Sequence, residues 1–142
     1  PFLEVSTADG QPIGSSVIAE GFIDLKVKVQ VPNWIEIDRL QVLVNGRQRP
    51  ENNYTRVLHP SLFQKKGTVA FDQTLRVHLQ QDAHLIVVAA GEKFDLSKGY
   101  GRSWESGMDP IAYTNPIYVD VDHNGFQPSG DNLGHPLLVT AK

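Results

Sequence analysis

The sequence predicts an all-β fold, an antiparallel β-sandwich with Ig-like topology, built as a single domain over residues 1–142. Three observations lead to this prediction. Val and Ile together far outnumber Ala and Met, and β-branched residues suit half-buried strands. Several short segments alternate apolar and polar residues, with turn residues between them. Apolar residues nowhere recur at helical spacing over three turns.

The N-terminal part of the chain contains two candidate edge strands and one strand of very regular pattern. Residues 2–6 and 13–18 are short segments that fit an edge position. Residues 22–31 place Ile, Leu and three Val in strict alternation with Asp, Lys and Gln. Such alternation predicts a half-buried strand whose apolar face lies in the core.

A hairpin is expected after the next strand. Residues 40–44 alternate again, and Asn45-Gly46 follows them directly. A type I′ turn needs positive φ at both central residues, and Asn and Gly accept this most readily. The return strand is expected at residues 47–49, and Pro50 would end it.

Three further strands are expected in the second half of the chain. Residues 68–79 alternate, and a bulge or bend would explain why Gln73 interrupts their apolar face. Residues 83–90 form a continuous apolar run, typical of a central strand covered on both faces. Residues 112–121 close the series, and Pro116 requires an edge position or a bulge there. The residues expected in the core are Ile23, Leu25, Val27, Val29, Leu40, Val42, Val44, Leu75, Val77, Leu85 and Val87.

Two connections, residues 51–64 and 92–110, are longer than such a fold requires. Their aromatic residues are first interpreted as caps on the open ends of the sandwich. The alternative is a carbohydrate- or surface-binding module, because exposed aromatic rings can stack on the apolar faces of sugars. The ligand-binding candidates in that alternative are Trp34, Tyr54, Tyr100 and Trp104.

Composition excludes several classes of function. The 13 basic and 16 acidic residues are interspersed, so no electrostatic footprint for nucleic acid is present. No apolar stretch approaches the ~20 residues of a membrane span. Cysteine is absent, which excludes disulfides, thiolate metal sites and Cys nucleophiles. No hydrolase or phosphate-binding motif occurs, so the domain itself is expected not to be an enzyme. The least favoured alternative is a free-standing hydrolase that uses His59, Asp72 or His84.

One polar motif follows the last long strand and matches the opening of a calcium loop. Asp120, Asp122 and Asn124 occupy positions 1, 3 and 5, with glycine at position 6. The Phe126 carbonyl and Asp131 at position 12 complete the expected ligand set for a possible calcium ion. The competing interpretation is ordinary turn chemistry, which also favours Asp, Asn and Gly. Without a cation the carboxylates should splay apart or pair with nearby donors.

Several stretches resemble the C-terminal domain of a family of multidomain bacterial metallohydrolases. The most specific is Ala-Tyr-Thr-Asn-Pro-Ile-Tyr-Val-Asp-Val-Asp at residues 112–122, followed by Asn-Gly-Phe at 124–126. Pro-Asn-Trp-Ile at 32–35 and Asp-Ala-His at 82–84 add to the likeness, as do Asp-Arg and Val-Leu-Val-Asn-Gly within 38–46. The family is the CehA/McbA group of the PHP (polymerase and histidinol phosphatase) superfamily.

The resemblance implies a non-catalytic C-terminal accessory domain with a structural or positioning role. The family's metal ligands lie in the preceding catalytic domain, and those His-rich motifs do not occur here, so no catalytic residue is carried over. The expected partner is the upstream catalytic domain of the same chain, and the expected location is outside the bacterial cytoplasm. Because the chain starts at Pro1 with no signal-like segment, we expect it to be a fragment of a longer polypeptide.

Overall fold

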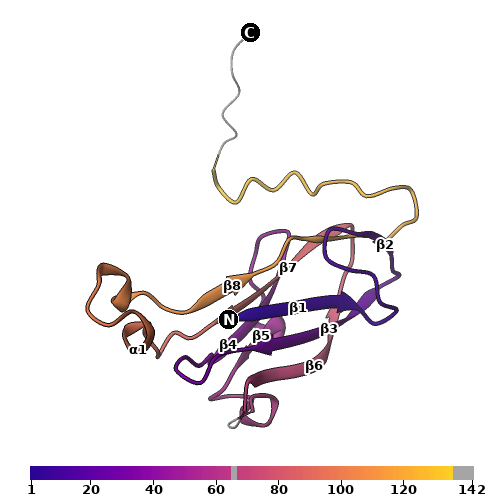
Figure 1. The fold of residues 1–142 in the computed structure, drawn as a ribbon. Helices are drawn as coiled ribbons and strands as arrows, with labels where there is room; N and C mark the ends of the chain where they lie inside the picture. Colours follow the sequence, from indigo (N-terminus) through magenta and orange to yellow (C-terminus); the bar gives the residue numbers. More distant parts are fainter. Residues whose placement is uncertain (65–66, 136–142) are drawn as a thin grey trace.

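The structure, a computed structural model, describes residues 1–64 and 67–135, and in these ranges the chain is mostly β (Figure 1). Two sheets are present, one of three strands in the order β1-β3-β6 and one of six strands. The second has the order β2-β9-β7-β4-β5, and β8 also pairs with β7. The strands are β1 (Phe2–Thr7), β2 (Ser16–Ile18), β3 (Phe22–Gln30), β4 (Arg39–Val44), β5 (Asn53–Thr55), β6 (Val69–His78), β7 (Ala83–Ala90), β8 (Ile111–Tyr113) and β9 (Ile117–Asp120). The helical segments are the short helix α1 (Ser97–Tyr100) and the 3-10 turns η1 (Pro50–Asn52), η2 (Pro60–Leu62) and η3 (Trp104–Gly107).

The two sheets share one hydrophobic core. The apolar faces of β3 and β6, from the three-stranded sheet, and of β4, β7 and β9, from the six-stranded sheet, belong to a single buried cluster. Every residue that the sequence predicted for the core is buried, which confirms the assignment of the faces of β3, β4, β6 and β7. Phe63 and Phe71 add an edge-to-face aromatic pair, with ring centroids 5.2 Å apart.

The prediction that all strands pair antiparallel is wrong for one pair. β2 runs parallel to β9, whereas the other strand pairs of the two sheets are antiparallel. The cause lies between β1 and β2, where two tight turns follow each other. The Gly10 N–H donates to the Thr7 carbonyl, and the Ser15 N–H donates to the Pro12 carbonyl. Because the chain reverses twice, β2 joins the edge of the six-stranded sheet parallel to β9, whereas antiparallel pairing was expected.

The Asn45-Gly46 turn is confirmed, but its return strand is not. Asn45 and Gly46 have φ of 53° and 76°, as a type I′ turn requires. Val44 and Arg47 exchange backbone hydrogen bonds of 2.9 and 3.0 Å, and the pairing stops at this isolated bridge. β4 pairs instead with β7 and with β5, a strand inside the long 51–64 connection.

The later strands differ from the predicted pattern at three places. The bulge in β6 is at Ala70, where the register with β3 shifts, and Gln73 pairs regularly with Val27. β7 is central in its sheet, as expected, but its outer face is only half-buried. The predicted strand at 112–121 is broken between β8 and β9, and in the gap the Thr114 hydroxyl accepts a hydrogen bond of 3.1 Å from the Val87 N–H.

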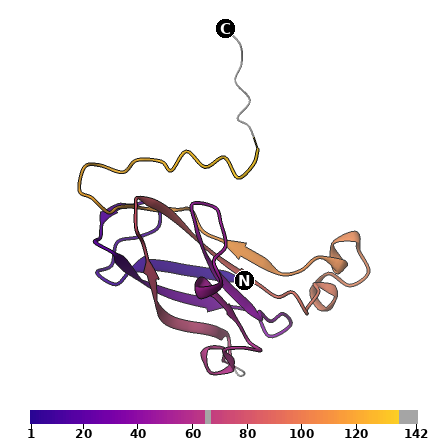
Figure 2. The ribbon, with the colours of Figure 1, turned by 180° about the vertical axis from the view of Figure 1, so that it is seen from behind.

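Two segments project from the sheets. Residues 91–110, between β7 and β8, extend away from the body of the domain in both views (Figures 1 and 2). The segment after β9 crosses one end of the sheets and then turns away from them (Figures 1 and 2). This second segment begins at the residues of the candidate site.

Candidate metal centre

Strand pairing brings two acidic residues together from distant parts of the sequence. β7 and β9 are antiparallel, with Ala83 opposite Val119. Asp82 precedes Ala83 and Asp120 follows Val119, so the two carboxylates lie at the same end of this pair. Asp122 comes two residues after Asp120. One oxygen from each of the three carboxylates lies within 4.8 Å of the others, and this cluster could hold a metal ion such as calcium.

Asp120 is the buried member of the cluster, with only 6% of its surface exposed. Its Oδ2 accepts a hydrogen bond of 2.8 Å from the Gly125 N–H. Its Oδ1 is buried and has no hydrogen-bond partner among the described residues. Buried carboxylate oxygens nearly always have a partner, so this one requires an explanation.

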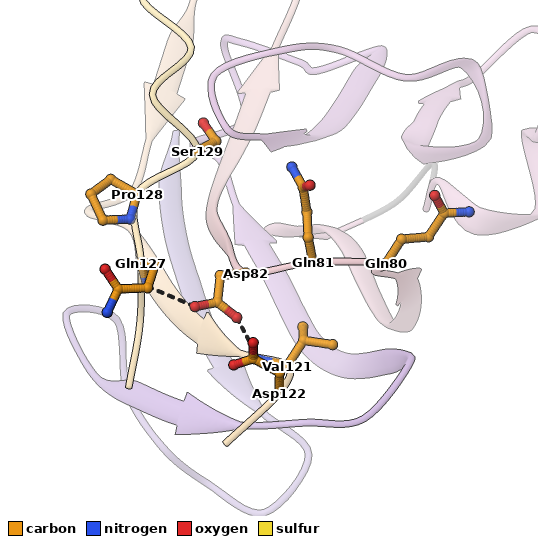
Figure 3. Close-up of a pocket in the computed structure, with 8 residues that line it drawn as sticks. All are labelled: Gln80, Gln81, Asp82, Val121, Asp122, Gln127, Pro128 and Ser129. Atoms are coloured by element: carbon orange, nitrogen blue, oxygen red, sulfur yellow. Dashed lines mark hydrogen bonds between the residues drawn. The ribbon is translucent and has the colours of Figure 1, made fainter. Parts of the chain in front are cut away.

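Asp82 anchors the chain that follows β9. Its Oδ1 accepts from the Val121 N–H at 2.8 Å, and its Oδ2 accepts from the Gln127 N–H at 2.7 Å (Figure 3). These two N–H groups stabilise the charged form and lower the pKa of the Asp82 carboxyl below its ordinary value. Asp82 is therefore held as a carboxylate, the form that binds cations.

Asp122 is exposed and is oriented by its own turn. Its Oδ2 accepts from the Asn124 side-chain amide at 2.7 Å, and its Oδ1 accepts from the Asn124 N–H at 3.3 Å. This is local Asx-type turn chemistry of the kind that the competing interpretation of the motif describes. The same bonds fix the Asp122 carboxylate beside Asp82 and Asp120.

Two further residues of the predicted calcium loop, Asp131 and Phe126, make side-chain contacts of their own. Asp131 forms a bidentate ion pair with Arg47, in which Nη2 lies 2.9 Å from Oδ1 and Nε contacts Oδ2. The Phe126 ring packs edge-to-face on Tyr118, with centroids 5.1 Å apart. Of the three carboxylates expected from one continuous loop, the cluster contains Asp120 and Asp122 but not Asp131, and it adds Asp82.

A surface pocket of about 350 Å³ adjoins the cluster. One wall is the β6–β7 turn and the other is the segment after β9 (Figure 3). Its lining residues are Gln80, Gln81, Asp82, Val121, Asp122, Gln127, Pro128 and Ser129. The pocket leaves space for water molecules beside the carboxylates, which a hard cation with few protein ligands would need.

The four aromatic candidates for sugar binding do not share one surface. Trp34 is half-buried against the core, and its ring meets Tyr100 edge-on, at 70° and 6.5 Å. Tyr54 is also half-buried and packs edge-to-face on His59. Trp104 is 82% exposed. The capping interpretation of the two long connections therefore fits Tyr54, whereas Tyr100 and Trp104 face solvent.

None of the three residues of the hydrolase alternative is a member of the acidic cluster. His59 accepts a long hydrogen bond of 3.4 Å from the Thr55 N–H through Nδ1, Asp72 is exposed on β6, and His84 is half-buried on β7. Within residues 1–64 and 67–135, Asp82, Asp120 and Asp122 are the one group of three or more acidic or His side chains close enough to share an ion. Hard oxygen ligands of this kind favour calcium or magnesium.

Comparison of this chain with family models, with curated proteins and with solved structures finds no match. No helix in the described ranges is long and apolar enough to cross a membrane.

Proposed function

We propose that this chain is a non-catalytic accessory module of a larger, exported bacterial metallohydrolase. In this proposal the module is an Ig-like β-sandwich that packs on the upstream catalytic domain, and it binds calcium at its acidic cluster. The resemblance to the CehA/McbA group suggests the class of the parent protein. The exposed surface of the domain gives the physical argument for an accessory role.

The strand order supports the Ig-like part of the proposal. In Ig domains one sheet contains strands A, B and E, and the other contains G, F and C, extended in variable-type domains by C′. Here β1-β3-β6 has the order A-B-E, and β9-β7-β4-β5 has the order G-F-C-C′. The shared core between the sheets fits the packing of a sandwich.

The observation that supports the accessory role is a group of exposed apolar side chains that lie close together in the sequence. Between residues 100 and 113 five large apolar side chains face solvent: Tyr100, Trp104, Met108, Ile111 and Tyr113. Exposed apolar side chains that form one patch mark interaction surfaces, and in this proposal these five form the surface that meets the catalytic domain. β1 and β8 approach each other, so a domain joined at Pro1 would lie beside this segment (Figure 1).

Calorimetry tests the accessory role directly. The domain is titrated with the polypeptide that precedes it in the parent protein, and association is expected. Trp104→Ser and Tyr113→Ser should each weaken binding by about tenfold or more, as buried aromatic anchors do. Val57→Ser is the matched control, because Val57 is 71% exposed but lies outside the 100–113 segment. Two domains that neither associate nor stabilise each other, even when tethered, would overturn the proposal.

A sugar-binding surface is the second candidate, favoured by the exposure of the Trp104 indole. Glycan-array binding that Trp104→Ala abolishes, combined with no affinity for the upstream polypeptide, would support this candidate over the first. An array without binders would remove it.

Calcium is the ion that fits the cluster best. Magnesium demands near-ideal octahedral geometry and keeps most of its water, whereas calcium accepts irregular sets of carboxylates, carbonyls and waters. The three carboxylates come from two chain segments and differ in burial, which is an irregular set of this kind. Titration with calcium chloride and magnesium chloride should show tighter binding of calcium.

A further inference from the structure

We infer that calcium bound by Asp82, Asp120 and Asp122 acts as a clasp that fastens the segment after β9 to the β6–β7 turn. This inference rests on the calcium site of the proposed function. It adds a consequence of calcium binding for the fold. The sequence motif alone pointed to a single continuous loop.

The unpartnered Oδ1 of Asp120 is the observation that points to a ligand. Three carboxylates close together are common on protein surfaces and need no ion. A carboxylate that is more than nine-tenths buried with one oxygen unbonded is rare, because the lost hydration is not replaced. A cation in the cluster would supply the missing partner.

The charges of the cluster are not balanced by protein cations. None of the ion pairs in the described part of the chain involves Asp82, Asp120 or Asp122. Like charges at this range repel each other, and a bound cation would offset that repulsion. Oxygens that bind one calcium at 2.3–2.6 Å lie no more than about 5 Å apart, and the three carboxylates meet this condition.

The position of the segment after β9 depends on the same carboxylates. Residues 121–135 form neither strand nor helix in the structure. The N–H groups of Val121 and Gln127 donate to Asp82, and the N–H of Gly125 donates to Asp120. An ion that holds Asp82 and Asp120 together therefore also holds the backbone that is bonded to them.

Hydrogen exchange with and without calcium chloride tests the clasp. If the segment opens only after the ion leaves, calcium at a hundredfold excess over its Kd should slow exchange at Val121, Gly125 and Gln127 by up to about a hundredfold. The amides around Gly99 and Gly101 lie in the projecting segment, which can open without disturbing the site. Their exchange rates should therefore be the same with and without calcium. Binding itself is measured in parallel by calorimetry.

Two variants of similar charge separate the ligands from their neighbours. Asp122→Asn should abolish both calcium binding and the slowed exchange, and its exposed position lets the fold persist. Asp131→Asn removes the same charge from the same segment. Asp131 accepts from Arg47 and from the Leu133 N–H and lies outside the acidic cluster, so calcium binding should persist. Equal loss of binding in both variants would overturn the ligand set.

The outcomes distinguish the clasp from the site. Calcium binding with slowed exchange at the three amides supports the inference. Calcium binding with unchanged exchange overturns the clasp and leaves the calcium site standing. No binding at millimolar calcium overturns both the clasp and the calcium site. The accessory role is then tested separately, by the calorimetry with the upstream polypeptide.

Discussion

The side chain of Val27 lies in the middle of the shared core and is almost wholly shielded from water. We expect Val27→Asp to unfold the domain, because an unpaired buried charge costs several kcal/mol, comparable to the whole stability of a domain. Circular dichroism and urea unfolding check this. Thr74→Asp is the control, because Thr74 is exposed on β6 opposite Lys26 and should tolerate the charge. A soluble Val27→Asp variant with a cooperative transition would show that the face of β3 is assigned wrongly.

Asp131 offers a test of electrostatics at a single residue. The guanidinium of Arg47, with a smaller contribution from the Leu133 N–H, lowers the pKa of Asp131 from its ordinary value of 3.8 to about 2. A lowered pKa in the folded state means that the ion pair contributes to stability above pH 4. That contribution is lost as the pH falls toward 2. Titration of the carboxyl by NMR should give a value near 2, and Arg47→Gln should return it toward 3.8. Equal values in the two proteins would remove Arg47 as the cause.

At the scale of elements, the projecting segment depends on a close approach of backbone and ring. A Cβ built on Gly99 would lie 2.4 Å from the ring of Trp34, which is closer than atoms can pack. Gly99→Ala should therefore displace α1 or the indole and destabilise this part of the fold by about 1–3 kcal/mol. Tryptophan fluorescence and thermal unfolding measure the effect. Gly107→Ala, where the added atom meets open space, should leave both unchanged. A Gly99→Ala variant with unchanged tryptophan fluorescence and an unchanged unfolding midpoint would show that the Trp34 indole packs elsewhere.

Alternating strands could be predicted from the sequence because one face of each is buried. In β3 the burial of the side chains alternates almost as the sequence predicts. β5 could not be predicted, since its three residues are all half-buried and lie in a connection rich in turn residues. The bulge at Ala70 also lacks a local signal, because it reflects the register with β3 rather than the sequence of β6.

At the scale of the whole molecule, the pairing of strands distant in sequence determines which carboxylates form the site. The Asp-x-Asp-x-Asn-Gly pattern is enough to find Asp120 and Asp122 as candidates. Asp82 lies 38 residues before Asp120 and joins them only because β7 and β9 are neighbours in register. Alternation of residues does not encode which strands are neighbours, so neither the third carboxylate nor the parallel β2–β9 pair could be predicted.

Thermal unfolding with millimolar calcium, repeated after addition of EDTA, is the measurement that tests the metal site most directly. Calcium bound to the folded state alone adds about 2.7 kcal/mol at a hundredfold excess over Kd. For a domain of this size that is a rise in Tm of roughly 5–10 °C. We predict that rise, its reversal by EDTA and its absence in Asp122→Asn. An identical midpoint with calcium and with EDTA would contradict the account and leave the three carboxylates as ordinary turn chemistry.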